Sequence, residues 1–192
     1  MKKSLATLIL SLTITALANG QFTKLGGSAG YSSGYYFHEM DWDYNRSGHF
    51  LGSLKGIYEL SLPVHISPSL SFFIPNVYTD AGGSKYTVST MMFDINGHYI
   101  FNSLDRFEFY GLAGLDFLFT WKKEKVQDQT YKEKDNALGL NLGVGTYMKI
   151  TESFDIYAEG KYLFNNKYNQ FILNAGILFN IEWMKKNENS EE

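Results

Sequence analysis

Residues 107–121 read FEFYGLAGLDFLFTW, and alternate positions of this stretch fall into two chemical classes. The odd-numbered positions are apolar or small: Phe107, Phe109, Gly111, Ala113, Leu115, Phe117, Phe119 and Trp121. The even-numbered positions bring in polar residues, among them Glu108, Asp116 and Thr120. Side chains of a β-strand point alternately to its two faces, whereas a helix would scatter both sets around its circumference. The stretch therefore predicts a long β-strand with one apolar face.

The same alternation recurs along much of the chain. It is found in residues 54–66, 91–101, 136–150, 154–164 and 171–183. The β-propensity and aromatic content of residues 27–37 and 70–78 favour two further strands, although their facing is ambiguous. We therefore predict an all-β chain of eight strands, which is the smallest common size of a transmembrane barrel.

The predicted connections alternate between short and long, as an antiparallel up-and-down barrel requires. Short links are predicted at residues 67–69, 102–106 and 151–153, and longer loops at residues 39–48, 79–85, 122–135 and 165–169. In barrels of this kind the short turns face the periplasm and the long loops face outward. Both chain ends are then expected on the periplasmic side.

Composition narrows the classes of protein that the chain can represent. The 192 residues are 44% hydrophobic and 17% aromatic, which suffices for one domain. A formal net charge of -3 offers no basic field for nucleic acid. Because there is no cysteine, disulfides and thiolate chemistry are excluded, and any metal site is left to His, Asp, Glu or main-chain oxygen. We expect no cofactor.

The first twenty residues have the pattern of a secretory signal peptide. Lys2 and Lys3 supply a positive start, residues 5–18 a short apolar run, and residues 18–20 a small-residue cleavage site before Gln21. The apolar run is shorter than the roughly 20 residues of a membrane-spanning helix. We expect the mature chain to begin at Gln21.

Alternation alone does not say whether the apolar face of the barrel points outward or inward. Three features favour lipid outside: strands of about 11 residues, which suit a tilted membrane span; charges at mid-strand on the polar face; and aromatic residues at the strand ends. The aromatic residues near one predicted turn and near the opposite rim are Tyr99, Phe101, Phe107, Phe109, Phe119, Trp121, Tyr162 and Phe164. The alternative is a secreted soluble barrel that binds an apolar ligand inside.

On these patterns, residues 21–183 resemble the small outer-membrane β-barrel family of the OmpA/OmpX type, including the barrel domains common in Bacteroidetes. The resemblance implies an integral protein of the Gram-negative outer membrane with a structural or surface-interaction role. It also implies contact with outer-membrane lipid and lipopolysaccharide, and with the barrel-assembly machinery during biogenesis. Such barrels often end on an aromatic residue, whereas here Trp183 precedes a polar tail at residues 184–192.

The polar faces supply acids and bases that we expect to form a structural network inside the barrel. This set comprises Lys55, Glu59, Asp94, His98, Glu108, Asp116, Lys149, Asp155, Glu159 and Lys161. Eight strands leave an interior just wide enough for side chains, so we expect these groups to pair with one another and fill the lumen. A narrow water or proton path is the weaker alternative.

Two predicted outer loops carry residues of chemical interest. Asp41-Trp42-Asp43-Tyr44-Asn45 has alternate acids like a calcium loop, but its sixth position is Arg46 and its twelfth is Gly52, so no calcium site is expected. The lysines of residues 122–135 could meet lipopolysaccharide phosphates. They are nearly cancelled by neighbouring acids, which favours an ordinary solvated loop.

A lipid-modifying enzyme is the remaining alternative, and it would need a histidine close to a serine or an acid. Only His38 and His49, near Ser47 and Asp41, offer such a pair, and no Gly-x-Ser-x-Gly or His-Glu-x-x-His run occurs. His65 and His98 are expected to be structural hydrogen-bonders. We therefore predict no catalytic, cofactor or metal site.

Overall fold

The fold was analysed in a computed structural model that describes residues 22–34, 49–61, 63–79, 82–126, 129–165 and 168–181. Within these ranges the chain forms nine β-strands. They are β1 (Phe22–Ser32), β2 (His49–Ser61), β3 (Val64–Phe73), β4 (Asn76–Thr79), β5 (Lys85–Leu104), β6 (Phe107–Val126), β7 (Gln129–Lys149), β8 (Phe154–Phe164) and β9 (Gln170–Asn180). No helix of the described residues is long and apolar enough to cross a membrane.

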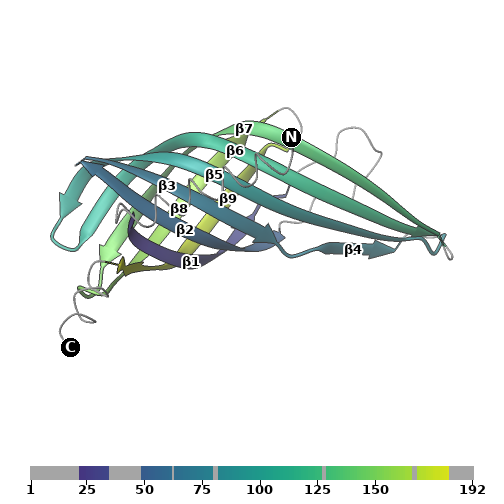
Figure 1. The fold of residues 1–192 in the computed structure, drawn as a ribbon, viewed down its shortest axis with the longest axis horizontal. Helices are drawn as coiled ribbons and strands as arrows, with labels where there is room; N and C mark the ends of the chain where they lie inside the picture. The colour runs from purple at the N-terminus through teal and green to yellow at the C-terminus, as the bar shows by residue number, and fades with distance from the viewer. Residues whose placement is uncertain are drawn as a thin grey trace, which may run out of the picture.

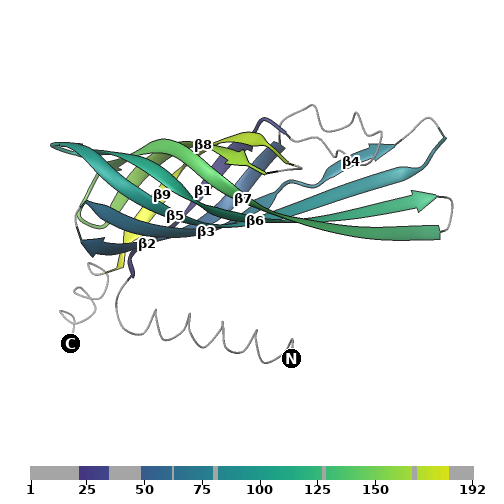
Figure 2. The same ribbon diagram turned by 90° about the horizontal axis from the view of Figure 1, so that it is seen from above.

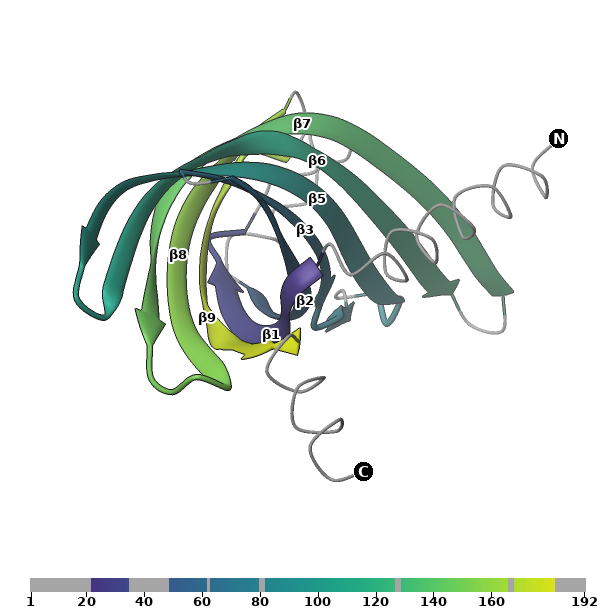
Figure 3. The ribbon, with the colours of Figure 1, turned by 60° about the vertical axis from the view of Figure 1, so that its left-hand side comes forward.

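The strands form one sheet that closes on itself. Its order is β3-β2-β1-β9-β8-β7-β6-β5-β4, and an additional pairing of β3 with β5 completes the ring. Every pairing is antiparallel, and β4 pairs only with the first four residues of β5. Eight strands therefore surround the axis in up-and-down order, which confirms the predicted fold class (Figures 1 and 3).

The two ends of the barrel differ in their connections. Three short turns, after Ser61, Leu104 and Lys149, lie at the same end as the start of β1 and the finish of β9. We call this the turn end and the opposite one the loop end. At the loop end β5, β6 and β7 continue well past the shorter strands, as Figures 1 and 2 show.

The predicted turn at residues 67–69 is wrong. Ser67 and Ser69 are buried within β3, and the turn falls between Ser61 and Val64, next to Pro63. Pro63 lies in the turn, where its missing N–H costs no ladder hydrogen bond, whereas Pro68 lies within β3 opposite Ile95. Outward positions carry even numbers in both β2 and β3, and among the described residues the only interruption in their pairing is a register shift between Glu59 and Ser61, so the alternation alone does not reveal the turn.

The predicted loop at residues 122–135 is also wrong, because most of it is strand. β6 runs to Val126, β7 begins at Gln129, and the two pair residue by residue from Val126–Gln129 inward. Both faces of this hairpin are polar, so it lacks the apolar side that identified the other strands. The strand predicted at residues 70–78 is divided into the end of β3 and β4, and β1 ends at Ser32.

The apolar alternating residues point away from the barrel axis. Leu138 and Val144 are each 62% exposed, whereas Asp94 and Lys161 are almost completely buried inside the ring. A charge that faced lipid at mid-strand would cost roughly 2 to 4 kcal/mol for lysine, which accounts for this arrangement. The alternative of a soluble barrel with an apolar pocket inside is therefore wrong.

Candidate functional site

Two oppositely charged pairs occupy the middle of the barrel. Lys55 on β2 donates a hydrogen bond to Glu159 on β8, although two strands lie between them in the sheet. Lys161 Nζ, also on β8, donates to Asp94 Oδ2 on β5 at 2.6 Å. All four side chains are at least 95% buried. Buried charges are tolerated only when paired and hydrogen-bonded, and this centre meets both conditions.

Neutral polar groups complete the surroundings of Asp94. Ser69 Oγ donates to Asp94 Oδ2 at 2.9 Å, and Asn141 Nδ2 donates to Asp94 Oδ1 at 2.9 Å. The same amide of Asn141 lies 3.0 Å from Asn96 Oδ1. Contacts from β3, β7 and β8 thus converge on one carboxylate of β5. Such a connected network fixes the relative positions of strands on opposite walls.

Aromatic rings lie on the turn-end side of the charged pairs. His98 stacks on Tyr110 with ring centroids 4.4 Å apart and an interplanar angle of 9°. His98 Nδ1 and Tyr147 Oη form a hydrogen bond of 2.6 Å, and Tyr110 Oη donates to Glu159 Oε2 at 3.1 Å. Lys55 Nζ lies 4.6 Å from the centroid of Tyr157. These rings fill the cross-section and remain bonded to the charged layer.

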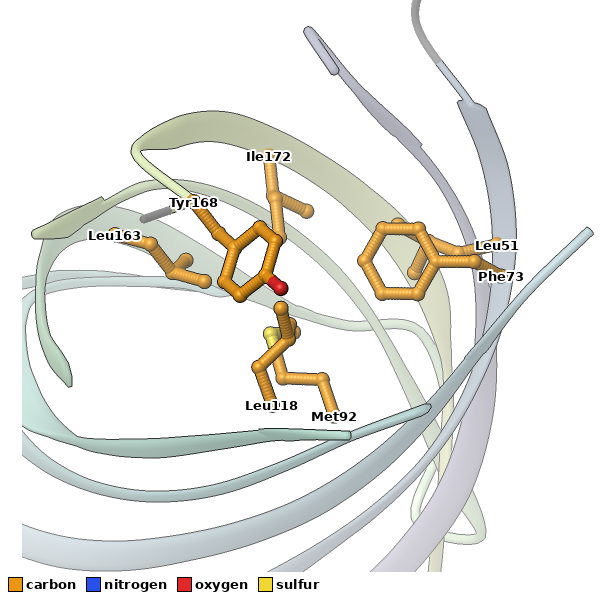
Figure 4. Close-up of a cluster of buried hydrophobic side chains, with 7 residues drawn as sticks. All are labelled: Leu51, Phe73, Met92, Leu118, Leu163, Tyr168 and Ile172. Carbon is orange, nitrogen blue, oxygen red and sulfur yellow. The ribbon is translucent and has the colours of Figure 1, made fainter. Parts of the chain in front are cut away.

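An apolar layer closes the lumen on the loop-end side of the charges. Met92, Leu118 and Leu163 lie one inward position beyond Asp94, Asp116 and Lys161 on their respective strands. The full cluster consists of Leu51, Phe73, Met92, Leu118, Leu163, Tyr168 and Ile172, drawn in Figure 4. Each member is at most 6% exposed. A layer of this kind leaves little room for a continuous file of water through the barrel.

The turn end of the lumen opens into a charged mouth with a cavity of about 330 Å³. Lys24 Nζ lies 2.8 Å from Asp155 Oδ2 and 3.8 Å from Glu59 Oε1. Glu108 and Lys149 line the same cavity. Lys24, Glu59, Glu108 and Lys149 are partly or fully exposed, in contrast to the central pairs, whereas Asp155 is buried.

The ten residues predicted for the lumen network therefore lie in two places. Six are central: Lys55, Asp94, His98, Asp116, Glu159 and Lys161. Four lie at the mouth: Glu59, Glu108, Lys149 and Asp155. Asp116 is buried directly opposite Asp94 in the β5–β6 pairing, and no side-chain donor among the described residues reaches its carboxylate. Sequence reasoning missed the neutral members of the network, although all of them stand at inward-facing positions of their strands. These members are Asn96, Tyr110, Asn141, Tyr147 and Tyr157.

The positions considered for catalysis and calcium lie mostly outside the described residues. This holds for His38, Ser47 and the stretch Asp41–Asn45. His49 is described and begins β2 opposite Ser32. Among the described residues there is no group of three or more His, Cys, Asp or Glu side chains arranged to hold a metal ion.

Comparison with known families identifies the barrel. The sequence profile of the outer membrane protein beta-barrel domain matches residues 4–180, which is nearly the whole chain. The chain belongs to this family. As a member of the outer membrane protein beta-barrel family, it is an integral barrel of the outer membrane, and the recognised resemblance is confirmed.

Solved structures of outer-membrane proteins share this fold. Ail of Yersinia pestis is 16% identical with a TM-score of 0.56, and the match covers 82% of this chain and 97% of Ail. The N-terminal barrel domain of Pseudomonas aeruginosa OprF is 16% identical with a TM-score of 0.52, covering 84% and 100% of the two chains. A major outer membrane protein of Thermus thermophilus is 14% identical with a TM-score of 0.55, covering 81% and 98%. A search of curated proteins gives no match.

Proposed function

We propose that this protein is a non-conducting, non-enzymatic structural barrel that holds an extended sheet at the cell surface for interaction with surface partners. In family barrels the short turns face the periplasm, so the loop end with its long strands β5, β6 and β7 faces outward. Polar side chains fill the middle of the lumen. The barrel is then a rigid base for the surface sheet rather than a pore.

The observation that carries this proposal is the layering of the lumen. From the loop end inward come the apolar cluster around Leu118 and Tyr168, the charged pairs around Asp94 and Glu159, and the aromatic rings around Tyr110. A hydrated ion would have to displace both buried ion pairs and also cross an apolar layer. Eight-stranded barrels in general have interiors that side chains can fill.

The proposal predicts that the purified wild-type barrel gives no stepwise ion conductance in a planar lipid bilayer. The measurement is a current recording at fixed voltage, with an open porin in the same bilayer as the positive control and buffer with detergent as the blank. Correct folding of the inserted sample is checked by a heat-shifted band on an SDS gel. Reproducible single-channel steps from the folded wild type would contradict the proposal.

We further propose that residues 1–20 are a signal peptide and that residues 184–192 form a polar tail after the barrel at 21–183. The first described strand begins at Phe22, directly after the predicted mature start at Gln21. We expect intact-mass measurement of the outer-membrane protein to fit a chain that begins at Gln21. Retention of residues 1–20 on the membrane-inserted protein would overturn this part of the proposal.

A surface-interaction role is supported by what is known of one structural neighbour. Ail, which is 19% identical in this comparison with a TM-score of 0.53, has been solved in complex with the heparin analogue sucrose octasulfate. For the present chain we propose outer-membrane lipid and lipopolysaccharide as partners at the surface. We also propose the barrel-assembly machinery as the partner during insertion.

A further inference from the structure

The part of the sheet that projects at the loop end carries different charges on its two faces. This projecting sheet comprises β4, residues 85–90 of β5, 120–126 of β6 and 129–136 of β7. Directly paired residues of an antiparallel sheet lie on the same face, so the register assigns every side chain. One face, here called the lysine face, carries Lys85, Lys123, Lys125, Lys132 and Lys134 with Thr87, Ser89, Trp121 and Thr130.

The acids of the projecting sheet all lie on the opposite face. Lys122 is buried there, 3.6 Å from Glu124 and 3.4 Å from Glu133, and 5.6 Å from the Tyr86 ring centroid. Asp135 pairs with Thr120 on that face and accepts a hydrogen bond from Tyr168. In sequence the acids cancel the lysines, but in space they neutralise only Lys122. The five lysines of the lysine face are exposed, and none has an ion-pair partner among the described residues.

The arrangement of these lysines works against the stability of the sheet. Lys85 lies directly opposite Lys125, and Lys123 lies directly opposite Lys132. Like charges in opposed positions destabilise a strand pair. Lysines on an edge strand can protect it from pairing with other chains, which would explain Lys132 and Lys134 on β7. That reason does not apply to the interior strands β5 and β6, so an anionic ligand is the better explanation.

The lysine face also has a defined height relative to the membrane. It continues the lipid-facing side of β6, where Phe117, Phe119 and Trp121 precede Lys123 and Lys125. At about 3.4 Å per residue, the two lysines lie roughly 7 and 14 Å along the strand beyond Trp121. With a strand tilt of about 45° this becomes roughly 5 and 10 Å of height, which is the level of lipid headgroups above the hydrocarbon core.

A hollow on this face offers room for a ligand. It has a volume of about 440 Å³ and is lined by Trp121, Lys123, Lys132 and Lys134, together with Ser89, Lys122 and Glu133. An indole at the membrane interface packs against the boundary between acyl chains and headgroups. The hollow thus combines an interfacial aromatic ring with Lys134 paired beside it and with Lys123 and Lys132 one position farther from the membrane on the same face.

We propose that the lysine face binds the phosphate groups of lipopolysaccharide in the outer leaflet, with Trp121 beside the glycolipid at the hollow. The inference deepens the proposed function and rests on its placement of the loop end at the cell surface. Phosphates of the outer-leaflet glycolipid meet the face from the side, at the height of the five lysines. Binding anchors the projecting sheet against the membrane surface.

The test measures how much bis-phosphorylated lipid A stays with the folded full chain after detergent exchange on an affinity column. The variant Lys123→Gln/Lys132→Gln/Lys134→Gln removes three charges from the hollow, and Lys123→Arg/Lys132→Arg/Lys134→Arg keeps them as the matched control. A lysine near an anionic membrane surface contributes roughly a fivefold change in affinity, so the glutamine variant should bind on the order of a hundredfold less tightly. The arginine variant should retain lipid A like the wild type.

Two further arms use the wild type alone and do not depend on how any variant folds. Retention should fall with added salt, and lipid A stripped of both phosphates should not be retained. Equal retention by the glutamine variant, or of dephosphorylated lipid A, would overturn the proposal. Wild-type binding of heparin in solution without lipid A retention would overturn it in favour of a soluble polyanion. The heat-shifted band reports barrel formation, and the conductance recording tests the proposed non-conducting barrel independently of lipid A binding.

Discussion

Replacement of Asp94 by leucine is expected to lower the free energy of unfolding of the barrel by about 3 to 5 kcal/mol, the usual cost of breaking a buried ion pair from one side. The carboxylate of Asp94 accepts hydrogen bonds from Lys161, Ser69 and Asn141, and it is completely buried. The variant leaves the ammonium group of Lys161, 1% exposed, without its closest counter-charge. Urea unfolding of the refolded protein in lipid vesicles, followed by the heat-shifted gel band, measures the loss.

The control for this prediction removes both charges. Asp94→Leu/Lys161→Met places two apolar side chains of similar length in the same space and strands no lysine, so most of the lost stability should return. Glu159 keeps its bond to Lys55 in this double variant. If Asp94→Leu unfolds at the wild-type urea concentration, the central pair does not stabilise the barrel in the way described.

The strand pattern of this barrel was predictable from sequence because lipid outside and a polar lumen inside impose strict alternation. Residues 107–121 show it most clearly, and every odd position there lies on the outward face of β6. Parity also predicted that Asp94, Glu159 and Lys161 face inward. These assignments depend only on the two-residue repeat of a strand, which holds except where an irregularity interrupts it, as between Ile100 and Asn102.

Which inward residues meet one another could not be predicted. Lys55 and Glu159 are 104 positions apart and lie on strands separated by two others, so their contact depends on the stagger of the strands around the ring. The position of each residue along the barrel axis depends in turn on where its strand begins and ends. Glu108 and Lys149 lie near strand ends and therefore reach the mouth rather than the centre.

The two wrong connections have the same physical origin as the correct strands. The tight turn after Ser61 leaves outward residues at even-numbered positions on both sides, and a proline does not mark it clearly, because Pro63 lies in the turn but Pro68 lies inside β3. The hairpin of β6 and β7 beyond the membrane has no hydrocarbon core on either side and thus no reason to be apolar. Its exposed lysines lie on one face of the sheet and its acids on the other, as Lys123 and Glu124 show. The net charge of the segment does not reveal this separation.

Replacement of Gly26 by alanine is expected to open the seam between β1 and β9. A methyl group at Gly26 would overlap with the carbonyl oxygen of Ile177 and contact the backbone of Leu178, both on β9. A flexible side chain could move aside, but backbone can shift only if the ladder itself moves. Overpacking a core usually costs about 1 to 3 kcal/mol, and the need to move a strand places this variant at or above the upper end.

The matched control is Gly111→Ala, the same substitution on the outward face of β6, where an added methyl group has no atom within 4 Å. Both variants reduce the freedom of the unfolded chain equally, so their difference isolates the close approach of β1 and β9. The midpoint urea concentration of the Gly111 variant should lie near that of the wild type. The Gly26 variant should have a much lower midpoint or show no heat-shifted band at all. Equal midpoints for the two variants would mean that β1 and β9 are not packed this closely, and the tight closure of the ring would need another cause.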